Sequence, residues 1–229
     1  VRTILSFAVN SRKGVADVVA RHYPYLAPFI RQFERIAASY EDKKRKSNNL
    51  DYDDLLSRWI DLLNRSAEAR ERLTRQFRYC LVDEYQDTNR LQHEVIQILA
   101  ERHKNLLVVG DDAQSIYSFR GADIRNILNF PKLFPGAKTF RLETNYRSTP
   151  EILNLANDVI ARNASQFPKE LKSVKPSFSK PSVVTAISTA QEAEFIAQRL
   201  LELRDEGVPL REMAVLFRAT HHSQSLEFE

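Results

Sequence analysis

The stretch YCLVDEYQDTN, residues 79–89, carries the strongest indication of fold in this chain. Its apolar run from Tyr79 to Val82 ends abruptly in Asp83 and Glu84. This pattern is typical of a buried strand that delivers carboxylates to its C-terminal edge, where open α/β sheets bind ligands. Thr88 can then cap a following amphipathic helix. The apolar positions of that helix are Leu91, Val95, Ile96 and Leu99.

The adjacent acids Asp83 and Glu84 suit phosphoryl transfer. Asp83 can hold Mg²⁺ directly or through water, while Glu84 orients and deprotonates the attacking water. An isolated Asp-Glu pair is usually only a solvated acidic turn. Gln86 and Asp87 add polar groups at the same edge, and this clustering favours a functional site.

A second block, VVGDDAQSIYSFRGA at residues 108–122, repeats the same architecture. The apolar run from Leu106 to Val109 predicts a short strand, and Gly110 permits a tight exit from it. A polar cluster follows, formed by Asp111, Asp112 and Gln114. A neutral amide in that cluster could contact a terminal phosphate without adding charge.

Two aromatic residues and a cation, Tyr117, Phe119 and Arg120, lie within four positions of one another. Such a group suits a base-stacking platform with a clamp for a nucleic-acid backbone. Aromatic residues near a strand end can equally be part of the core. The sequence alone leaves both interpretations open.

A third block, RLETNYRST, spans residues 141–149. Tyr146 is a candidate to stack on adenine, and the permanently charged fork of Arg147 suits a γ-phosphate. The alternative is a surface arginine before a helix N-terminus. That terminus would be formed by Ser148, Thr149 and Pro150.

The three blocks together resemble the UvrD/Rep/PcrA group of superfamily-one DNA helicases. DExQDTN, GDxxQSIYxxRGA and LExNYRST occur here in the order of that group. The resemblance implies a P-loop NTPase (RecA-like) parallel sheet, with ATP and Mg²⁺ as cofactors. It also implies single-stranded and duplex DNA as partners, and Asp83 and Glu84 as the Walker B residues for magnesium and for water activation.

The same resemblance gives roles to the other two blocks. Gln114 would sense the γ-phosphate and couple it to DNA, Tyr146 would lie beside adenine, and Arg147 would be an arginine finger. Gln86 and Asp111 are expected near the nucleotide. The residues along the single-strand path would be Tyr117, Phe119 and Arg120.

Two positions depart from the usual pattern of the group. Phe119 stands where its members usually carry tryptophan, and Tyr85 stands where many have phenylalanine. Both residues keep an aromatic ring, so the implied roles are only slightly weakened.

The resemblance extends over nearly the whole chain. NLDYDDLL at 49–56 looks like the segment that leads from the inserted 1B subdomain back to the first motor domain. EAEFIAQRL at 192–200 and MAVLFRATHHSQSLE at 213–227 look like the start of the second motor domain.

A phosphate-binding loop of the form GxxxxGK[ST] is absent from the sequence, since none of the five glycines is followed by Lys-Ser or Lys-Thr. The motifs nearest the C-terminus of these helicases are also missing. We therefore expect an internal fragment of a longer helicase that does not hydrolyse ATP alone. Its natural partner would be the missing N-terminal part of the motor domain.

Hydrophobic periodicity predicts the domain organisation. We expect a helical 1B-like subdomain and connection at 1–76, a RecA-like motor part at 77–163, a linker at 164–181 and the start of a second RecA-like domain at 182–229. Within these ranges the patterns predict helices over 150–163 and 189–205, the latter with a Thr189–Glu192 capping box. They also predict strands over 183–187 and 214–217.

Composition constrains the class of protein. The net charge is +4, with its basic excess in the N-terminal third, and the run Lys43 to Lys46 could contact a DNA backbone or simply be a solvated helix end. No apolar run is long enough for a membrane span. The single Cys80 cannot form a disulfide within the chain, which suits the cytoplasm.

The leading hypothesis is a motor fragment of an ATP-dependent DNA helicase that translocates on single-stranded DNA and unwinds duplexes. Repair or replication proteins would be further partners. One alternative is the helicase subunit of a recombination helicase-nuclease. Another is a non-hydrolysing module that binds DNA or docks a protein, although the intact acids and Arg147 argue against it.

Overall fold

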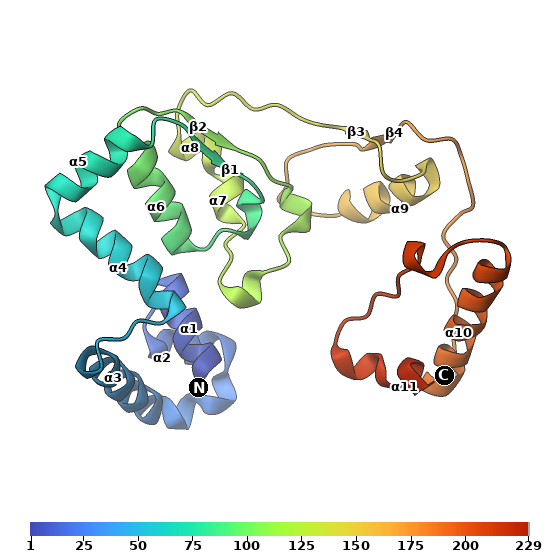
Figure 1. The fold of residues 1–229 in the computed structure, drawn as a ribbon, viewed down its shortest axis with the longest axis horizontal. Helices are drawn as coiled ribbons and strands as arrows, with labels where there is room; N and C mark the ends of the chain where they lie inside the picture. Colours follow the sequence, from blue (N-terminus) through green and yellow to red (C-terminus); the bar gives the residue numbers. More distant parts are fainter. Residues whose placement is uncertain (229) are drawn as a thin grey trace.

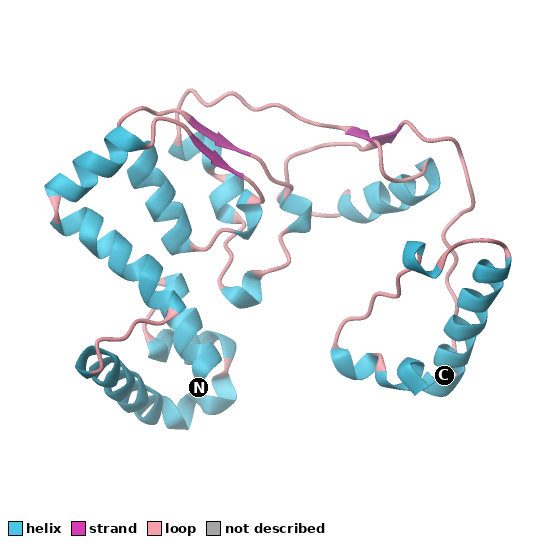
Figure 2. Ribbon diagram, viewed as in Figure 1, coloured by secondary structure: helices cyan, strands magenta, loops and turns pink. Residues whose placement is uncertain are grey.

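The computed structural model describes residues 1–228, in which helices dominate and the strands are few and short. Figure 2 shows two separate pairs of strands among the helices. The described part of the chain is thus mainly helical, with two small parallel sheets. Within the described residues, no helix is both long and apolar enough to cross a membrane.

The N-terminal part is helical, as the sequence predicts for residues 1–76 (Figure 1). A 3-10 segment, Pro24–Phe29, separates the second helix from the third. The helices are α1 (Arg2–Ser11), α2 (Val15–His22), α3 (Ile30–Lys46), α4 (Tyr52–Arg65) and α5 (Ala67–Gln76).

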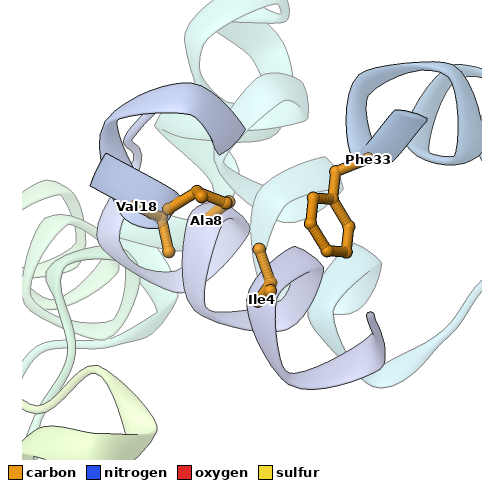
Figure 3. Close-up of a cluster of buried hydrophobic side chains, with 5 residues drawn as sticks. Ile4, Ala8, Val18 and Phe33 are labelled. Carbon is orange, nitrogen blue, oxygen red and sulfur yellow. The ribbon is translucent and has the colours of Figure 1, made fainter. Parts of the chain in front are cut away.

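Helices α1, α2 and α3 share one hydrophobic core. Figure 3 shows Ile4 and Ala8, one turn apart on α1, beside Val18 of α2 and Phe33 of α3. The 3.6-residue period of the helix places such positions on one face. Each fully buried Val or Phe side chain contributes about 1.5–3 kcal/mol to the free energy of unfolding.

A second core joins α4 to helix α6 (Arg90–Ala100). Ile60 of α4 is fully buried against Leu91 and Val95 of α6. Leu56 and Trp59 pack beside them. This core fixes α6, and with it the turn that precedes α6, against the helical part.

Strands β1 (Cys80–Val82) and β2 (Leu106–Val108) form a parallel pair, with α6 as the crossover between them. Each strand is one residue shorter than predicted. In residues 1–228 no third strand joins this pair. Leu81, in the middle of β1, is 73% exposed, because no other part of the described chain covers the face of the sheet on which its side chain lies; the prediction of a buried strand is therefore wrong.

The N-cap of helix α6 lies one residue later than predicted. Asn89, and not Thr88, is the N-cap: its side chain accepts the backbone N–H of Gln92 at 2.8 Å, and the Gln92 side chain accepts the N–H of Asn89 at 2.9 Å. The Thr88 hydroxyl instead donates to the Tyr85 carbonyl at 2.7 Å. The reciprocal Asn-Gln pair satisfies two free backbone donors, whereas a Thr88 cap would satisfy one.

The second sheet pairs β3 (Thr144–Asn145) in parallel with β4 (Lys172–Ser173). Helix α9 (Pro150–Ile160) connects them and ends earlier than the predicted residue 163. The remaining helices are the short α7 (Arg125–Leu128) and α8 (Phe130–Leu133), then α10 (Thr189–Asp205) and α11 (Gln224–Phe228).

Two details predicted for the C-terminal part are wrong. The capping residue of α10 is Ser188, whose hydroxyl accepts the N–H of Gln191 at 3.2 Å. The predicted Thr189–Glu192 capping box does not form, and the side chain of Gln191 accepts the N–H of Ile187 at 2.8 Å. The strands predicted over 183–187 and 214–217 do not form. A strand needs a neighbour for its backbone groups, and neither segment has one within the described residues.

Candidate functional site

Strand β1 delivers the two acids of the first block to an exposed edge. Glu84 adopts a left-handed backbone conformation with φ of 49°, which is uncommon for a residue other than glycine. This conformation turns the chain into the 3-10 segment Tyr85–Asp87. Asp83 accepts the backbone N–H of Glu84 at 2.9 Å, and both side chains remain exposed to solvent.

The buried side chain of Tyr85 holds this turn in place. Its side chain is fully buried, its hydroxyl lies 2.6 Å from His93 Nδ1, and its ring meets Phe130 edge-on with centroids 5.6 Å apart. Burial raises the pKa of Tyr85 to about 12 and lowers the pKa of His93. The pair therefore stays neutral, with the tyrosine hydroxyl able to donate to the imidazole.

Gln86 connects the ends of β1 and β2. Its amide nitrogen donates to Glu84 Oε2 at 2.7 Å, and its amide oxygen accepts the backbone N–H of Asp111 at 3.0 Å. Gly110 makes this approach possible, because a Cβ atom there would lie 2.5 Å from Gln86 Oε1 and 2.9 Å from Ile127 Cδ1. The sequence gives no sign of this cross-link.

The hydrogen-bond network continues into the second block. Asp111 accepts the side-chain amide of Gln114 at 2.8 Å and the backbone N–H of Ala113 at 3.0 Å. Burial opposes ionisation of Asp111, yet hydrogen bonds from Lys169 and Gln114 outweigh it, so the pKa of Asp111 lies below its usual range. Gln114 itself is exposed at the end of this network.

Tyr117, Phe119 and Arg120 form a single exposed cluster. The two rings lie 5.9 Å apart between centroids, and Arg120 Cζ lies 5.1 Å from the Tyr117 ring and 5.5 Å from the Phe119 ring. Tyr117 is 37% exposed and Phe119 58%. In this structure neither ring belongs to the core, so both can reach a ligand.

The third block lies at the end of β3. Asn145 accepts the backbone N–H groups of Arg147 at 2.9 Å and of Ser148 at 2.8 Å, which holds the turn before α9. The side chains of Tyr146 and Arg147 are both exposed. No hydrogen bond or ion pair in residues 1–228 joins either side chain directly to the first two blocks. Hydrogen bonds do connect the predicted site residues Glu84, Gln86, Asp111 and Gln114 in one network.

Asp83 and Glu84 present exposed carboxylates at the end of β1, the kind of oxygen ligand that Mg²⁺ takes in proteins. Asp87 Oδ1 is buried and has no hydrogen-bond partner among the described residues, and burial, then the neighbouring Glu84, raises the pKa of Asp87. Within these residues no group of three His, Cys, Asp or Glu side chains could hold a metal unaided. Mg²⁺ typically uses only one or two carboxylates, with phosphate oxygens and water completing its shell.

One residue of this network is missing from the sequence-based prediction. Lys169 forms ion pairs with both Asp111 and Asp112, although the sequence predicts a linker over residues 164–181. It is separated from its partners by more than fifty residues, and a lysine between prolines and serines carries no periodic signal.

Comparison with known proteins gives two consecutive matches. Residues 14–135 match the UvrD/REP helicase N-terminal domain, and residues 140–229 match the UvrD-like helicase C-terminal domain. The first match alone covers more than half of the chain.

Two relatives illustrate the similarity. ATP-dependent DNA helicase PcrA of Staphylococcus aureus (strain Mu50) is 42% identical over 218 residues, which cover 95% of this chain and 30% of the relative. The PcrA protein of Staphylococcus epidermidis (strain ATCC 35984) is 43% identical over 188 residues, or 82% of this chain and 26% of the relative. The chain thus spans less than a third of the relatives it matches, and it belongs to the UvrD/Rep family of helicases.

Proposed function

We propose that this chain is part of an ATP-dependent DNA helicase that couples ATP hydrolysis to translocation on single-stranded DNA and to duplex unwinding. One observation carries the proposal: hydrogen bonds run without interruption from Glu84 through Gln86 and Asp111 to Gln114. A base and a phosphate-sensing amide are thereby held at neighbouring strand ends. The relatives named ATP-dependent DNA helicase PcrA support the same activity.

The hydrolytic step we propose uses the exposed acids of β1. A water molecule attacks the γ-phosphorus in line, the bond to the ADP oxygen breaks, and Glu84 accepts the proton of the water. The neutral amide of Gln86 donates to Glu84 Oε2 at 2.7 Å, which orients the carboxylate. Mg²⁺, held by Asp83 and the phosphates, would neutralise charge that develops on the phosphate oxygens.

Three further side chains would complete the nucleotide site. The amide of Gln114 would contact the γ-phosphate, and the guanidinium of Arg147 would stabilise the transition state as an arginine finger. Tyr146 would stack on the adenine. The backbone N–H of Arg147 donates to Asn145 Oδ1 at 2.9 Å, which holds the turn that carries this arginine at the end of β3.

Single-stranded DNA would lie on the exposed cluster of Tyr117, Phe119 and Arg120. Stacking on the two rings would be largely independent of base identity, and Arg120 would contact the backbone. We further propose a RecA-like motor part at 77–163, preceded by a 1B-like part at 1–76, with a second motor domain beginning at 182. A DNA-processing motor of this kind, with one free cysteine, suits the cytoplasm.

The test is Glu84→Gln in the full-length helicase that carries this chain. The substitution keeps size and hydrogen bonding but removes the base, so we expect ATP binding to persist while turnover falls by a factor of about 10² or more. Arg147→Ala should lower turnover by about 10³ or more. Exposed Glu68 on α5 provides the matched control, since Glu68→Gln should leave turnover unchanged. Unaltered turnover in Glu84→Gln contradicts the proposed role.

A further inference from the structure

The segment between α9 and β4 folds back onto the second block. Phe167 donates its backbone N–H to Asp112 Oδ2 at 3.1 Å. The ammonium group of Lys169 lies 3.2 Å from Asp112 Oδ1 and forms a still closer ion pair with Asp111 Oδ1. Figure 1 shows the chain leaving α9, approaching the region after β2 and returning to β4.

These three charged groups are largely withdrawn from water. Only 17% of the Lys169 side chain and 4% of the Asp112 side chain are exposed. Burial lowers the pKa of Lys169, but the two aspartates outweigh this effect and raise it above its usual range. A buried carboxylate is costly unless a cation compensates it, so the contact is strongly favoured once the segment is in place.

Lys169 also lies between the second and the third block. Three residues later, Lys172 donates its backbone N–H to the Glu143 carbonyl at 2.7 Å as β4 pairs with β3. Ser173 donates its hydroxyl to the carbonyl of Ser148, the neighbour of Arg147, at 2.7 Å. A short stretch of chain thus holds Asp111 at one end and the Arg147 turn at the other.

We propose that Lys169 is a positioning residue that fixes Asp111, and through it Gln114, relative to the strand pair that carries Arg147. The inference rests on the proposed function, because this placement matters for catalysis only if the helicase hydrolyses ATP. Without the ammonium group, Asp111 loses the ion pair that holds its carboxylate in place, and the buried carboxylate of Asp112 is left uncompensated. Asp111 then turns toward solvent, and Gln114 loses the acceptor that holds its amide.

The experiment compares three variants of the full-length helicase: Lys169→Gln, Lys169→Arg and Lys172→Gln. Lys172 is a matched control, since it is an exposed lysine three residues away on the same segment. We expect Lys169→Gln to lower kcat of DNA-stimulated ATP hydrolysis by about tenfold, the scale of energetic coupling through a contact network, with little change in KM for ATP. Lys169→Arg should restore most of kcat, and Lys172→Gln should match the unsubstituted protein.

A second pair of measurements separates positioning from folding. Lys169→Gln combined with Asp112→Asn removes the uncompensated buried charge, so its Tm should return toward that of the unsubstituted protein while kcat stays low. Hydrogen exchange over residues 110–120 should be faster in Lys169→Gln than in Lys172→Gln. Recovery of kcat together with Tm in the double variant, or unchanged exchange in Lys169→Gln, would overturn the proposal.

The outcomes also distinguish this inference from the proposed function. If the unsubstituted protein hydrolyses ATP and Lys169→Gln retains its kcat, the role of Lys169 is wrong and the helicase activity stands. If the unsubstituted protein shows no DNA-stimulated hydrolysis, the proposed function is wrong and the catalytic role of Lys169 falls with it.

Discussion

The side-chain oxygen of Gln86 accepts the backbone N–H of Asp111 at 3.0 Å, so one buried amide joins the ends of two parallel strands. The nitrogen of the same amide donates to Glu84. The planar amide of glutamine offers a strong acceptor and a strong donor in one group. These two hydrogen bonds explain a glutamine at position 86 without any ligand. The predicted contact of Gln86 with nucleotide stays a prediction.

Gln86→Leu tests the cross-link. The substitution leaves the N–H of Asp111 without its acceptor beneath the strand ends, so we expect the free energy of unfolding to fall by about 1–3 kcal/mol. Urea unfolding measures this change. Gln76→Leu at the exposed end of α5 should stay within about 0.5 kcal/mol. Equal effects at the two glutamines would show that the contact contributes nothing specific.

The exposed rings of the second block give a prediction about DNA. Tyr117→Ala and Phe119→Ala in the full-length helicase should each weaken single-strand binding by about 1–3 kcal/mol, with little dependence on base identity. Arg120→Ala should instead reduce the salt dependence of binding, because a phosphate contact releases counterions and a stacked base does not. Fluorescence titration at several salt concentrations measures both quantities.

The control for the aromatic variants is Phe178→Ala, since Phe178 is an exposed phenylalanine outside the cluster. Its removal should leave affinity unchanged. Thermal melting of all variants checks that the fold is retained. Unchanged affinity in both Tyr117→Ala and Phe119→Ala would contradict the platform assignment.

Local sequence patterns correctly predicted those elements that depend mainly on residues close together in the chain. The apolar run that ends in Asp83 and Glu84 predicts a strand with acids at its end, and the structure has this arrangement. The helical stripes of the N-terminal part follow in the same way from a period of 3.6 residues. Cap positions were less certain, because Thr88 and Asn89 are both good caps and only the Gln92 partner decides between them.

Features that depend on distant partners could not be predicted. The apolar stretch at 183–187 has strand composition, yet a strand forms only when another chain segment supplies hydrogen bonds. Lys169 sits in a segment of linker composition, and its role comes from carboxylates more than fifty residues away. The hydrogen bond between Tyr85 and His93 could not be predicted either, because a tyrosine and a histidine eight residues apart do not by themselves indicate a buried polar contact.

The basic run at the end of α3 contains two lysines in opposite environments. Lys44 is nearly buried, and its ammonium group lies 2.6 Å from Glu41, 3.0 Å from Asp51 and 2.8 Å from Asp54. Lys46 is solvated, and among the described residues its ammonium group pairs with Asp42 alone, at 2.7 Å. Lys44 is therefore committed to the capping acids of α4 and is not free to contact a DNA backbone.

Lys44→Gln and Lys46→Gln form a matched pair that tests this difference. Removing Lys44 leaves a buried acidic cluster uncompensated, so we expect a loss of about 2–3 kcal/mol, below the loss for a fully buried pair because two of the acids are partly exposed. Removing Lys46 should cost at most about 0.5 kcal/mol. Urea unfolding measures both values. A larger effect for Lys46→Gln would contradict the assignment.

The hydrogen bond between Tyr85 and His93 predicts a specific response to acid. Burial lowers the pKa of His93 and outweighs the opposite influence of Asp123 and Glu94. The folded chain therefore binds a proton at this site less readily than the unfolded chain, whose histidine titrates near about 6.5. The stabilisation from neutral His93 is complete above that pH and is lost as the pH falls toward the lower pKa of the folded state.

His93→Gln should flatten this part of the pH dependence, because a glutamine oxygen can still accept the Tyr85 hydroxyl but does not titrate. We expect the free energy of unfolding of the unsubstituted chain to fall between about pH 7 and pH 5, with a slope of up to about 1.4 kcal/mol per pH unit from one proton. Urea unfolding at each pH measures the slope. The exposed His221 is the control, since His221→Gln should retain the slope that His93→Gln loses. Identical slopes for the two variants would mean that protonation of His93 does not limit stability in acid.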